Sequence, residues 1–191
     1  VLTRSADKKE GGIISLSVGN DDYHKSLFAY NSGKGVKGWS TSILMSRTAG
    51  STYANGTNFE GYNYYWALGY AKPGGNHDFQ FTFTGAPQWH NQRYSYAPIS
   101  SYIQYGGKDN DPNTKWNPDS GRLFGEEYAS RVNFYHKPVM SLNWDWKISE
   151  KSKLSTVVYA SFGRGGGTGF LGSINGNTVF SNKLKDANGQ I

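Results

Sequence analysis

HDFQFTFTG, residues 77–85, alternates apolar and polar side chains without a break. Phe79, Phe81 and Phe83 fall on one side, and Gln80, Thr82 and Thr84 fall on the other. Such a run predicts a β-strand with one apolar and one polar face. In a soluble sandwich the apolar face would meet a protein core. In a transmembrane barrel it would meet lipid, and the polar face would meet a wet lumen.

Six further segments have the character of strands, and no segment predicts a helix. They are 12–18, 24–32, 39–47, 62–71, 139–148 and 154–163. The clearest is VMSLNWDWKI, residues 139–148, where Met, Leu, Trp, Trp and Ile alternate with Ser, Asn, Asp and Lys. The sequence therefore predicts an all-β chain of about seven antiparallel strands.

The connections between these strands differ in length in an ordered way. Short turns such as KPGGN, residues 72–76, and SEKSK, residues 149–153, alternate with long segments at about 48–61, 86–138 and 164–191. The link GNDDY, residues 19–23, is a short exception. In an up-and-down barrel every other connection lies on the same rim, with short periplasmic turns and long extracellular loops. The spacing favours a fragment of a large transmembrane β-barrel over a sandwich.

Composition narrows the class of protein further. The chain has 191 residues, 36% hydrophobic and 16% aromatic, with 25 glycines and a mean hydropathy of −0.66. No apolar run of about 18 residues is present, which excludes a transmembrane helix but not transmembrane strands. The absence of cysteine excludes disulfides and thiolate metal sites. The net charge of +6 is scattered through turns, so we expect no nucleic-acid partner.

Several motifs carry a family resemblance. VLTRSADKKEGGIISLSVGN, SLFAYNSG, YANGTNFEGYNYYWALG, FTGAPQWHNQR and NFYHKPVMSLNWDWKISEKSKLSTVVYASFGRGGG resemble the TonB-dependent outer-membrane receptors of Bacteroidetes type, in that order along the chain. The likeness spans most of residues 1–172. It implies that residues 1–11 end a plug domain and its linker, and that residues 12–191 begin the barrel.

The resemblance also implies a setting and partners. The complete barrel would have 22 strands in the outer membrane of a Gram-negative bacterium, with the plug in its lumen and lipid around it. TonB, with ExbB and ExbD, would drive uptake of a nutrient. A surface lipoprotein is a further partner that the resemblance allows. Both ends of the chain look cut, and we expect a fragment of about the first third of the barrel wall.

One aromatic and polar cluster is a candidate ligand site at the base of an extracellular loop. It comprises Trp89, His90, Asn91, Gln92 and Arg93. Aromatic rings and amides together could stack on and hydrogen-bond a polar ligand. The alternative is that the cluster fixes the loop to the barrel rim.

A second motif, DNDPNTKWNPDSG at residues 109–121, is similar to a calcium loop. Asp109, Asp111, Asn113 and Asp119 could gather one Ca²⁺, although Thr114 and Ser120 stand where an EF-hand has Gly and Glu. The alternative is a polar loop with a proline-set turn. No other cofactor is indicated. Since no paired carboxylates and no Ser-His-Asp arrangement can be argued, we do not expect an enzyme.

Three functions remain open from the sequence. The first is a receptor that transports a nutrient, and the second is a barrel that acts as a scaffold for surface lipoproteins or a larger outer-membrane complex. The third is a soluble carbohydrate-binding sandwich, whose aromatic faces would pack inward. Trp39, Tyr62, Trp144 and Trp146 lie near strand ends, as aromatic girdles at membrane interfaces do. The substrate stays open among glycan, peptide, siderophore and vitamin.

Overall fold

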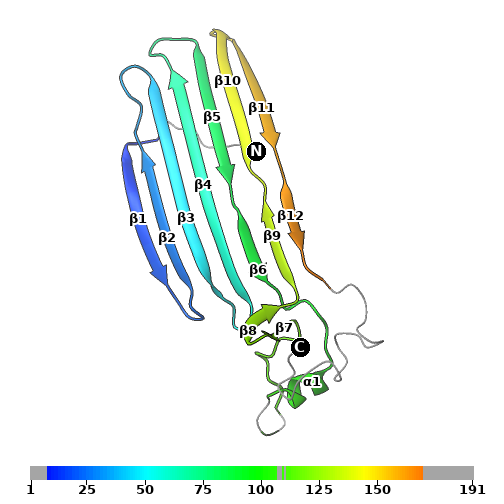
Figure 1. Cartoon of the computed structure of the whole chain (residues 1–191). Helices are drawn as coiled ribbons and strands as arrows, with labels where there is room; N and C mark the ends of the chain where they lie inside the picture. The colour runs from blue at the N-terminus through cyan, green and yellow to red at the C-terminus, as the bar shows by residue number, and fades with distance from the viewer. Residues whose placement is uncertain (1–7, 107–108, 110, 170–191) are drawn as a thin grey trace.

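A computed structural model describes residues 8–106, 109 and 111–169. Its main body is a single antiparallel sheet in the order β1-β2-β3-β4-β5-β10-β11, with β6, β9 and β12 attached (Figure 1). The strands are β1 (Gly11–Val18), β2 (His24–Asn31), β3 (Trp39–Ser51), β4 (Asn58–Ala71), β5 (His77–Gly85), β6 (Gln88–Asn91), β9 (Val132–His136), β10 (Val139–Ser149), β11 (Ser152–Ser161) and β12 (Arg164–Gly167). A helix, α1 (Ile99–Gln104), and a hairpin of β7 (Ser120–Leu123) and β8 (Glu126–Ala129) lie at one end of the sheet.

Three of the strands are longer than the sequence suggested, because they continue past a break. Gly85 of β5 pairs with Tyr64 of β4, and Gln88 of β6 pairs with Gly61 of β4, so the pairing register is unchanged across residues 86 and 87. In the same way, β10 pairs with β5 and β9 pairs with β6 in one continuous register. The pairs β11 with β10 and β12 with β9 also share one register. The sheet is therefore seven long strands.

Proline explains why two of these strands are interrupted. Pro87 and Pro138 have no backbone N–H to give to the ladder. Their carbonyl groups still accept hydrogen bonds from Tyr62 N at 2.9 Å and Phe162 N at 3.2 Å. The strand direction is kept while the regular hydrogen bonding lapses for about two residues.

The expected loop limits are therefore wrong in three places. The segment 48–61 is mostly strand, and only residues 52–57 connect β3 to β4. The segment 86–138 begins with β6 and ends with β9, and also contains α1 and the β7–β8 hairpin. The segment 164–191 starts with β12, and residues 170–191 lie outside the described part of the chain. The expectation of no helix was also wrong, since α1 forms a short helix.

The alternation of the strands gives the sheet two unlike faces. The apolar face carries Ile14, Leu16, Phe28, Tyr30, Ile43, Met45, Tyr64, Trp66, Leu68, Phe79, Phe81, Phe83, Met140, Leu142, Trp144, Trp146, Leu154 and Val158, as the cross-strand pairs show. The other face is mainly small and polar, and we call it the polar face. Ser42, Ala67, Thr82 and Ser141 form one row across it, in which the hydroxyls of Thr82 and Ser141 are 2.6 Å apart.

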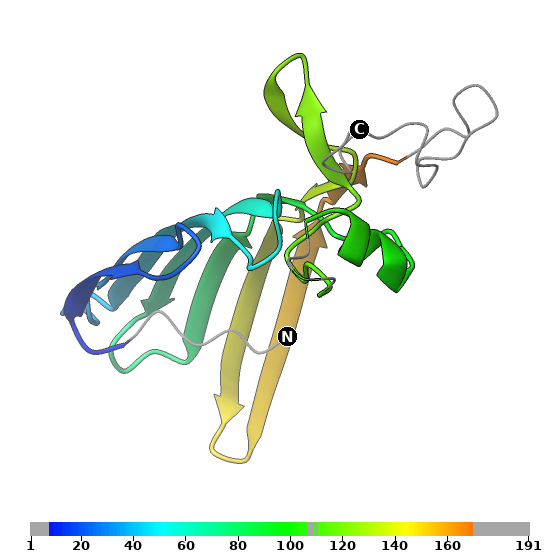
Figure 2. The same ribbon diagram turned by 90° about the horizontal axis from the view of Figure 1, so that it is seen from below.

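No second layer covers the apolar face within residues 8–106, 109 and 111–169. The sheet is curved but open, and α1 and the β7–β8 hairpin sit beyond its end (Figures 1 and 2). Exposed side chains on this face include Ile14, Leu16, Phe28, Met45 and Leu142. The all-β antiparallel prediction is confirmed, whereas the described strands do not close into a barrel.

Connection length follows the expected alternation only in part. The links β2–β3, β4–β5 and β10–β11 lie at one end of the sheet, and β1–β2, β3–β4 and the segment 92–131 with α1 lie at the other (Figure 1). We call these the short-turn end and the long-loop end. The β2–β3 link spans residues 32–38 and is longer than β3–β4 at 52–57, so among the described residues only 92–131 is a long connection. The β1–β2 link is short because Asp21 and Asp22 both adopt φ 57°, which suits a two-residue hairpin turn. None of the helices in the described residues is long and apolar enough to cross a membrane.

Candidate functional site

The candidate ligand residues lie on and just after β6, and strand geometry divides them between the two faces. Gln88 pairs with Gly61 and Tyr135, and His90 pairs with Phe59 and Asn133. Successive side chains of a strand point to opposite faces. His90 is therefore on the polar face, whereas Trp89 and Asn91 are on the apolar face. The five predicted residues do not converge on one ligand.

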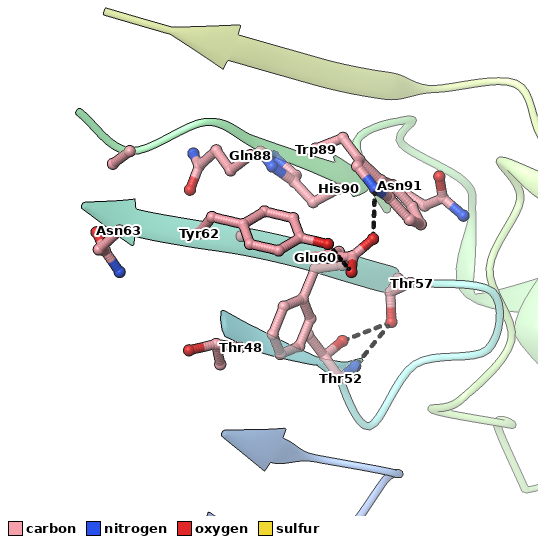
Figure 3. A pocket seen from close by; sticks show the side chains of 13 residues that line it. Thr48, Thr52, Thr57, Glu60, Tyr62, Asn63, Gln88, Trp89, His90 and Asn91 are labelled. Atoms are coloured by element: carbon pink, nitrogen blue, oxygen red, sulfur yellow. Dashed lines mark hydrogen bonds between the residues drawn. The ribbon is translucent and has the colours of Figure 1, made fainter. Parts of the chain in front are cut away.

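A hollow of about 430 Å³ lies at the long-loop end, beside β3, β4 and β6. Its lining on the polar face comprises Thr48, Phe59, Gly61, Asn63, Gln88 and His90 (Figure 3). Gly61 leaves space at its centre, since a Cβ there would meet the Gln88 side chain at 3.4 Å. His90 Nε2 is 3.3 Å from the Gln92 amide nitrogen, so these two predicted residues do lie together.

The chemistry of this hollow is polar and uncharged on the polar face. The Asn63 amide donates to Ser46 Oγ at 3.2 Å, and Thr57 is hydrogen-bonded to Thr52 at 2.6 Å. The Gln88 amide has no hydrogen-bond partner among the described residues, and it is half-buried. A free amide, an imidazole and the Phe59 ring on one wall could hold a neutral polar ligand.

Trp89 belongs to a different cluster, on the apolar face. Its indole nitrogen is 3.4 Å from Glu60 Oε2, while Tyr62 donates to Glu60 Oε1 at 2.7 Å (Figure 3). Arg47 Nε donates to the same Oε1 at 2.6 Å. We call Arg47, Glu60, Tyr62 and Trp89, together with His24, the rim cluster. It places a hydrogen-bonded ion pair at the long-loop end of the apolar face.

Arg93 anchors loops to one another. Its guanidinium donates to the Thr114 carbonyl at 2.7 Å and to the Tyr53 hydroxyl at 2.6 Å. It also lies 5.2 Å from the centre of the Tyr53 ring, within cation–π range. These contacts join the β3–β4 loop to the segment that precedes β7.

The four candidate calcium ligands differ in burial and in their hydrogen-bond partners. Asp119 is buried, and its Oδ2 accepts the backbone N–H groups of Tyr94 at 2.8 Å and Ser95 at 2.7 Å. Asn113 hydrogen-bonds within its own loop, and Asp109 and Asp111 are exposed. In the described part of the chain no three His, Cys, Asp or Glu residues form a group that could hold a metal. The calcium site stays a prediction.

A small buried cluster that was not predicted from the sequence holds the loops together. We call Asn117, Asp119 and Ser95 the loop latch. The Asn117 amide donates to Asn55 O at 2.9 Å and, at 3.4 Å, to Gln92 O, which joins the β3–β4 loop to the segment after β6. A proline between two acidic or amide side chains, NPD at residues 117–119, was the available signal for a tight polar turn.

No known protein family matches the sequence, and the searches of curated proteins and of solved structures likewise found no match.

Proposed function

We propose that this chain is the first part of the wall of an outer-membrane β-barrel that takes up a nutrient in a TonB-dependent manner. The observation that carries the membrane location is the apolar face. It extends across seven strands, and no layer covers it within the described residues. A soluble sandwich would need a second layer over these side chains, because exposing so much contiguous apolar surface to water is unfavourable.

The length of the apolar face supports a bilayer as its solvent. On β4 it extends between Glu60, which belongs to the rim cluster, and Tyr70, which contacts Trp39 with 4.6 Å between ring centres. These two positions are separated by about ten residues at about 3.3 Å each, or about 33 Å along the strand. A strand tilt of about 40° turns this into about 25 Å of depth, the height of the apolar band in such barrels.

Aromatic rings at the short-turn end support the same placement. His77, Phe79, Trp144 and Trp146 form a stack whose neighbouring ring centres lie 5.5–6.1 Å apart. Trp144 Nε1 donates to His77 Nδ1 at 3.1 Å. Rings with a polar edge are favoured where hydrocarbon meets headgroups. The stacking of Trp144 and Trp146 at this end thus supports the proposed girdle.

The uptake role rests on the family resemblance and on the polar-face hollow. The lumen of the proposed barrel would be lined by the polar face, so Gln88, His90 and Phe59 would face a ligand that enters from the long-loop end. We assign transport to the complete barrel together with its plug, TonB, ExbB and ExbD.

A scaffold role is the second candidate, and the β7–β8 hairpin favours it. Phe124 at its tip is 98% exposed and has φ 52°, an unusual backbone conformation for a bulky residue. The hairpin extends from the end of the sheet (Figure 2). An exposed ring on a projecting hairpin is a suitable contact for a partner such as a surface lipoprotein.

Bacterial genetics separates these two functions. Strains that lack the full-length gene, or TonB, would be grown on a panel of single nutrients, namely glycans, peptides, siderophores and vitamins. Uptake predicts that both strains fail on the same compound and that plasmid-borne protein with Gln88→Ala and His90→Ala restores growth poorly. Normal growth of the gene deletion on every compound, with co-purification of a lipoprotein lost in Phe124→Ser, would reject uptake in favour of the scaffold.

A further inference from the structure

A second hollow, of about 500 Å³, lies on the apolar face between β1 and β4. Ile14, Leu16, Phe28, Met45, Tyr62 and Tyr64 line it from four adjacent strands, together with Ser26 and Arg47. Register explains the hollow. Ser26 pairs with Leu16 on one side and with Arg47 on the other, so one small side chain interrupts a row of large ones. The gap in that row is the hollow, which we call the outer groove.

The outer groove is polar at one end only. Arg47 and Ser26 lie toward the long-loop end, and the next row toward the short-turn end is Ile14, Phe28, Met45 and Tyr64. The row after that holds Tyr30, Ile43 and Trp66. A cationic group therefore sits at the mouth of a continuous apolar surface, where the rim cluster marks the edge of the proposed bilayer.

Arg47 has hydrogen-bonding capacity left for a ligand. Its Nε donates to Glu60 and its Nη1 lies 3.0 Å from His24 Nε2, which uses two of five guanidinium N–H groups. The Arg47 side chain is 45% exposed, whereas Glu60 is 21% exposed and is covered by Arg47, Tyr62 and Trp89. The Ser26 hydroxyl is exposed and has no hydrogen-bond partner among the described residues. An incoming anion would meet the guanidinium and the hydroxyl first.

We propose that the outer groove binds one phosphate-bearing lipid of the outer leaflet, with an acyl chain on Phe28 and Met45 and the phosphate on Arg47 and Ser26. Guanidinium and phosphate form strong, charge-assisted hydrogen bonds. The inference rests on the proposed membrane location, because the groove is continuous with the face that would contact hydrocarbon. That continuity, with a cation at the headgroup level, selects a lipid over a peptide or a soluble anion.

The experiment is native mass spectrometry of the full-length protein from detergent, with lipid A that carries its phosphates or with phosphate-free lipid A. We expect one retained molecule of the phosphorylated lipid and about tenfold weaker retention of the phosphate-free form, the loss typical of a charge-assisted hydrogen bond. Arg47→Gln should lower retention of the phosphorylated lipid by a similar factor. Ser26→Trp should abolish retention by filling the groove while leaving Arg47 in place.

Lys25→Gln is the matched control. It removes a positive charge next to Ser26 in the sequence, but the Lys25 side chain lies on the opposite, polar face of the sheet. It should retain lipid like the unchanged protein. Equal retention of both lipids, or full retention by Ser26→Trp, would overturn the inference. Recovery of each variant in the outer-membrane fraction separates the two proposals. Protein found there without retained lipid contradicts the lipid site alone, whereas protein absent from that fraction before any substitution contradicts the membrane location.

Discussion

At the scale of single residues, Gly85 is a position where an added side chain would clash with an interaction between strands. A Cβ at Gly85 would overlap the Tyr64 hydroxyl and lie 3.0 Å from His136 Nε2. The Tyr64 hydroxyl and that nitrogen are 2.8 Å apart, so Tyr64 reaches across β5 from β4 to β9. Because glycine has no Cβ, residue 85 leaves room for the Tyr64 side chain to make this hydrogen bond.

Gly85→Ala should therefore destabilise the full-length protein by about 1–3 kcal/mol, the usual cost of overpacking. The urea midpoint of the lipid-inserted protein measures the change. Gly163→Ala is the control, because its Cβ would meet only the flexible Lys137 side chain at 3.4 Å. Adding Tyr64→Ala to Gly85→Ala should restore part of the loss. An unchanged midpoint in Gly85→Ala would show that the Tyr64 bridge is not formed.

Asp119 makes a second residue-scale prediction. Replacing it by alanine leaves the half-buried N–H of Tyr94 and the buried N–H of Ser95 without an acceptor, at a cost of about 2–4 kcal/mol. The loop between residues 92 and 131 should then open more often, and limited proteolysis within it should accelerate about tenfold or more. Asp111→Ala, at an exposed carboxylate, should cleave at the original rate. Equal rates in both variants would reject the loop latch, and slower cleavage of the unchanged protein in added Ca²⁺ would support the calcium hypothesis.

Odd- and even-numbered residues of a strand face opposite sides of the sheet, so the numbering alone could have predicted that the candidate ligand residues lie on two different faces. Phe79, Phe81 and Phe83 share odd positions with Trp89, and the alternation continues through Gly85 and Pro87 without a shift. The strand was predicted to end at Gly85 because a glycine and a proline usually end a strand. Asp119 could not be assigned from sequence in this way, because its partners at 94 and 95 are distant in the chain.

At the scale of elements, the existence of the seven long strands was predictable, whereas their lengths and the β7–β8 hairpin were not. The alternation in 77–85 and 139–148 located β5 and β10 to within one residue at each end. β3 extends to Ser51 and β4 begins at Asn58, and the added residues, TAGS at 48–51 and NFEG at 58–61, each include a glycine, which is depleted in strands. α1 has six residues, no buried side chain and no side-chain cap, so it has no periodicity to detect.

The facing of β10 gives the element-scale prediction. Leu142 is exposed on the apolar face, and Asn143 beside it lies on the polar face. Arginine facing lipid near the midplane costs about 2–4 kcal/mol, whereas water in a lumen solvates the charge. Leu142→Arg should therefore reduce outer-membrane assembly of the full-length protein much more than Asn143→Arg, as measured by the folded fraction in that membrane.

Asn143 is a better polar-face control than Thr82, because Thr82 is almost fully buried and lies beside Ala67 and Ser141. A large side chain at 82 would fail for lack of space, whatever the solvent. Equal losses for Leu142→Arg and Asn143→Arg would contradict the assigned facing. A larger loss for Asn143→Arg would indicate that the polar face packs against protein.

At the scale of the whole molecule, the proposed direction across the membrane rests on the long segment 92–131 at one end of the sheet and the β4–β5 and β10–β11 turns at the other. The turn signals KPGGN and SEKSK predicted those two turns, because tight turns depend on local residues. The arrangement of α1, β7 and β8 was not predictable, since the loop latch that fixes it joins residues far apart in sequence. The proposed barrel places the long-loop end outside the cell and the short-turn end in the periplasm.

Single cysteines test this direction. Tyr96 and Glu126 are exposed at the long-loop end, and Val36 and Lys151 are exposed at the short-turn end. Because these 191 residues contain no cysteine, each substitution introduces one thiol into this part of the protein. Tyr96→Cys and Glu126→Cys should react with a membrane-impermeant maleimide on intact cells. Val36→Cys and Lys151→Cys should react only after the outer membrane is opened, since the reagent cannot otherwise reach the periplasm. The reverse pattern would invert the assigned direction, and labelling of all four on intact cells would mean that the sheet does not cross the membrane.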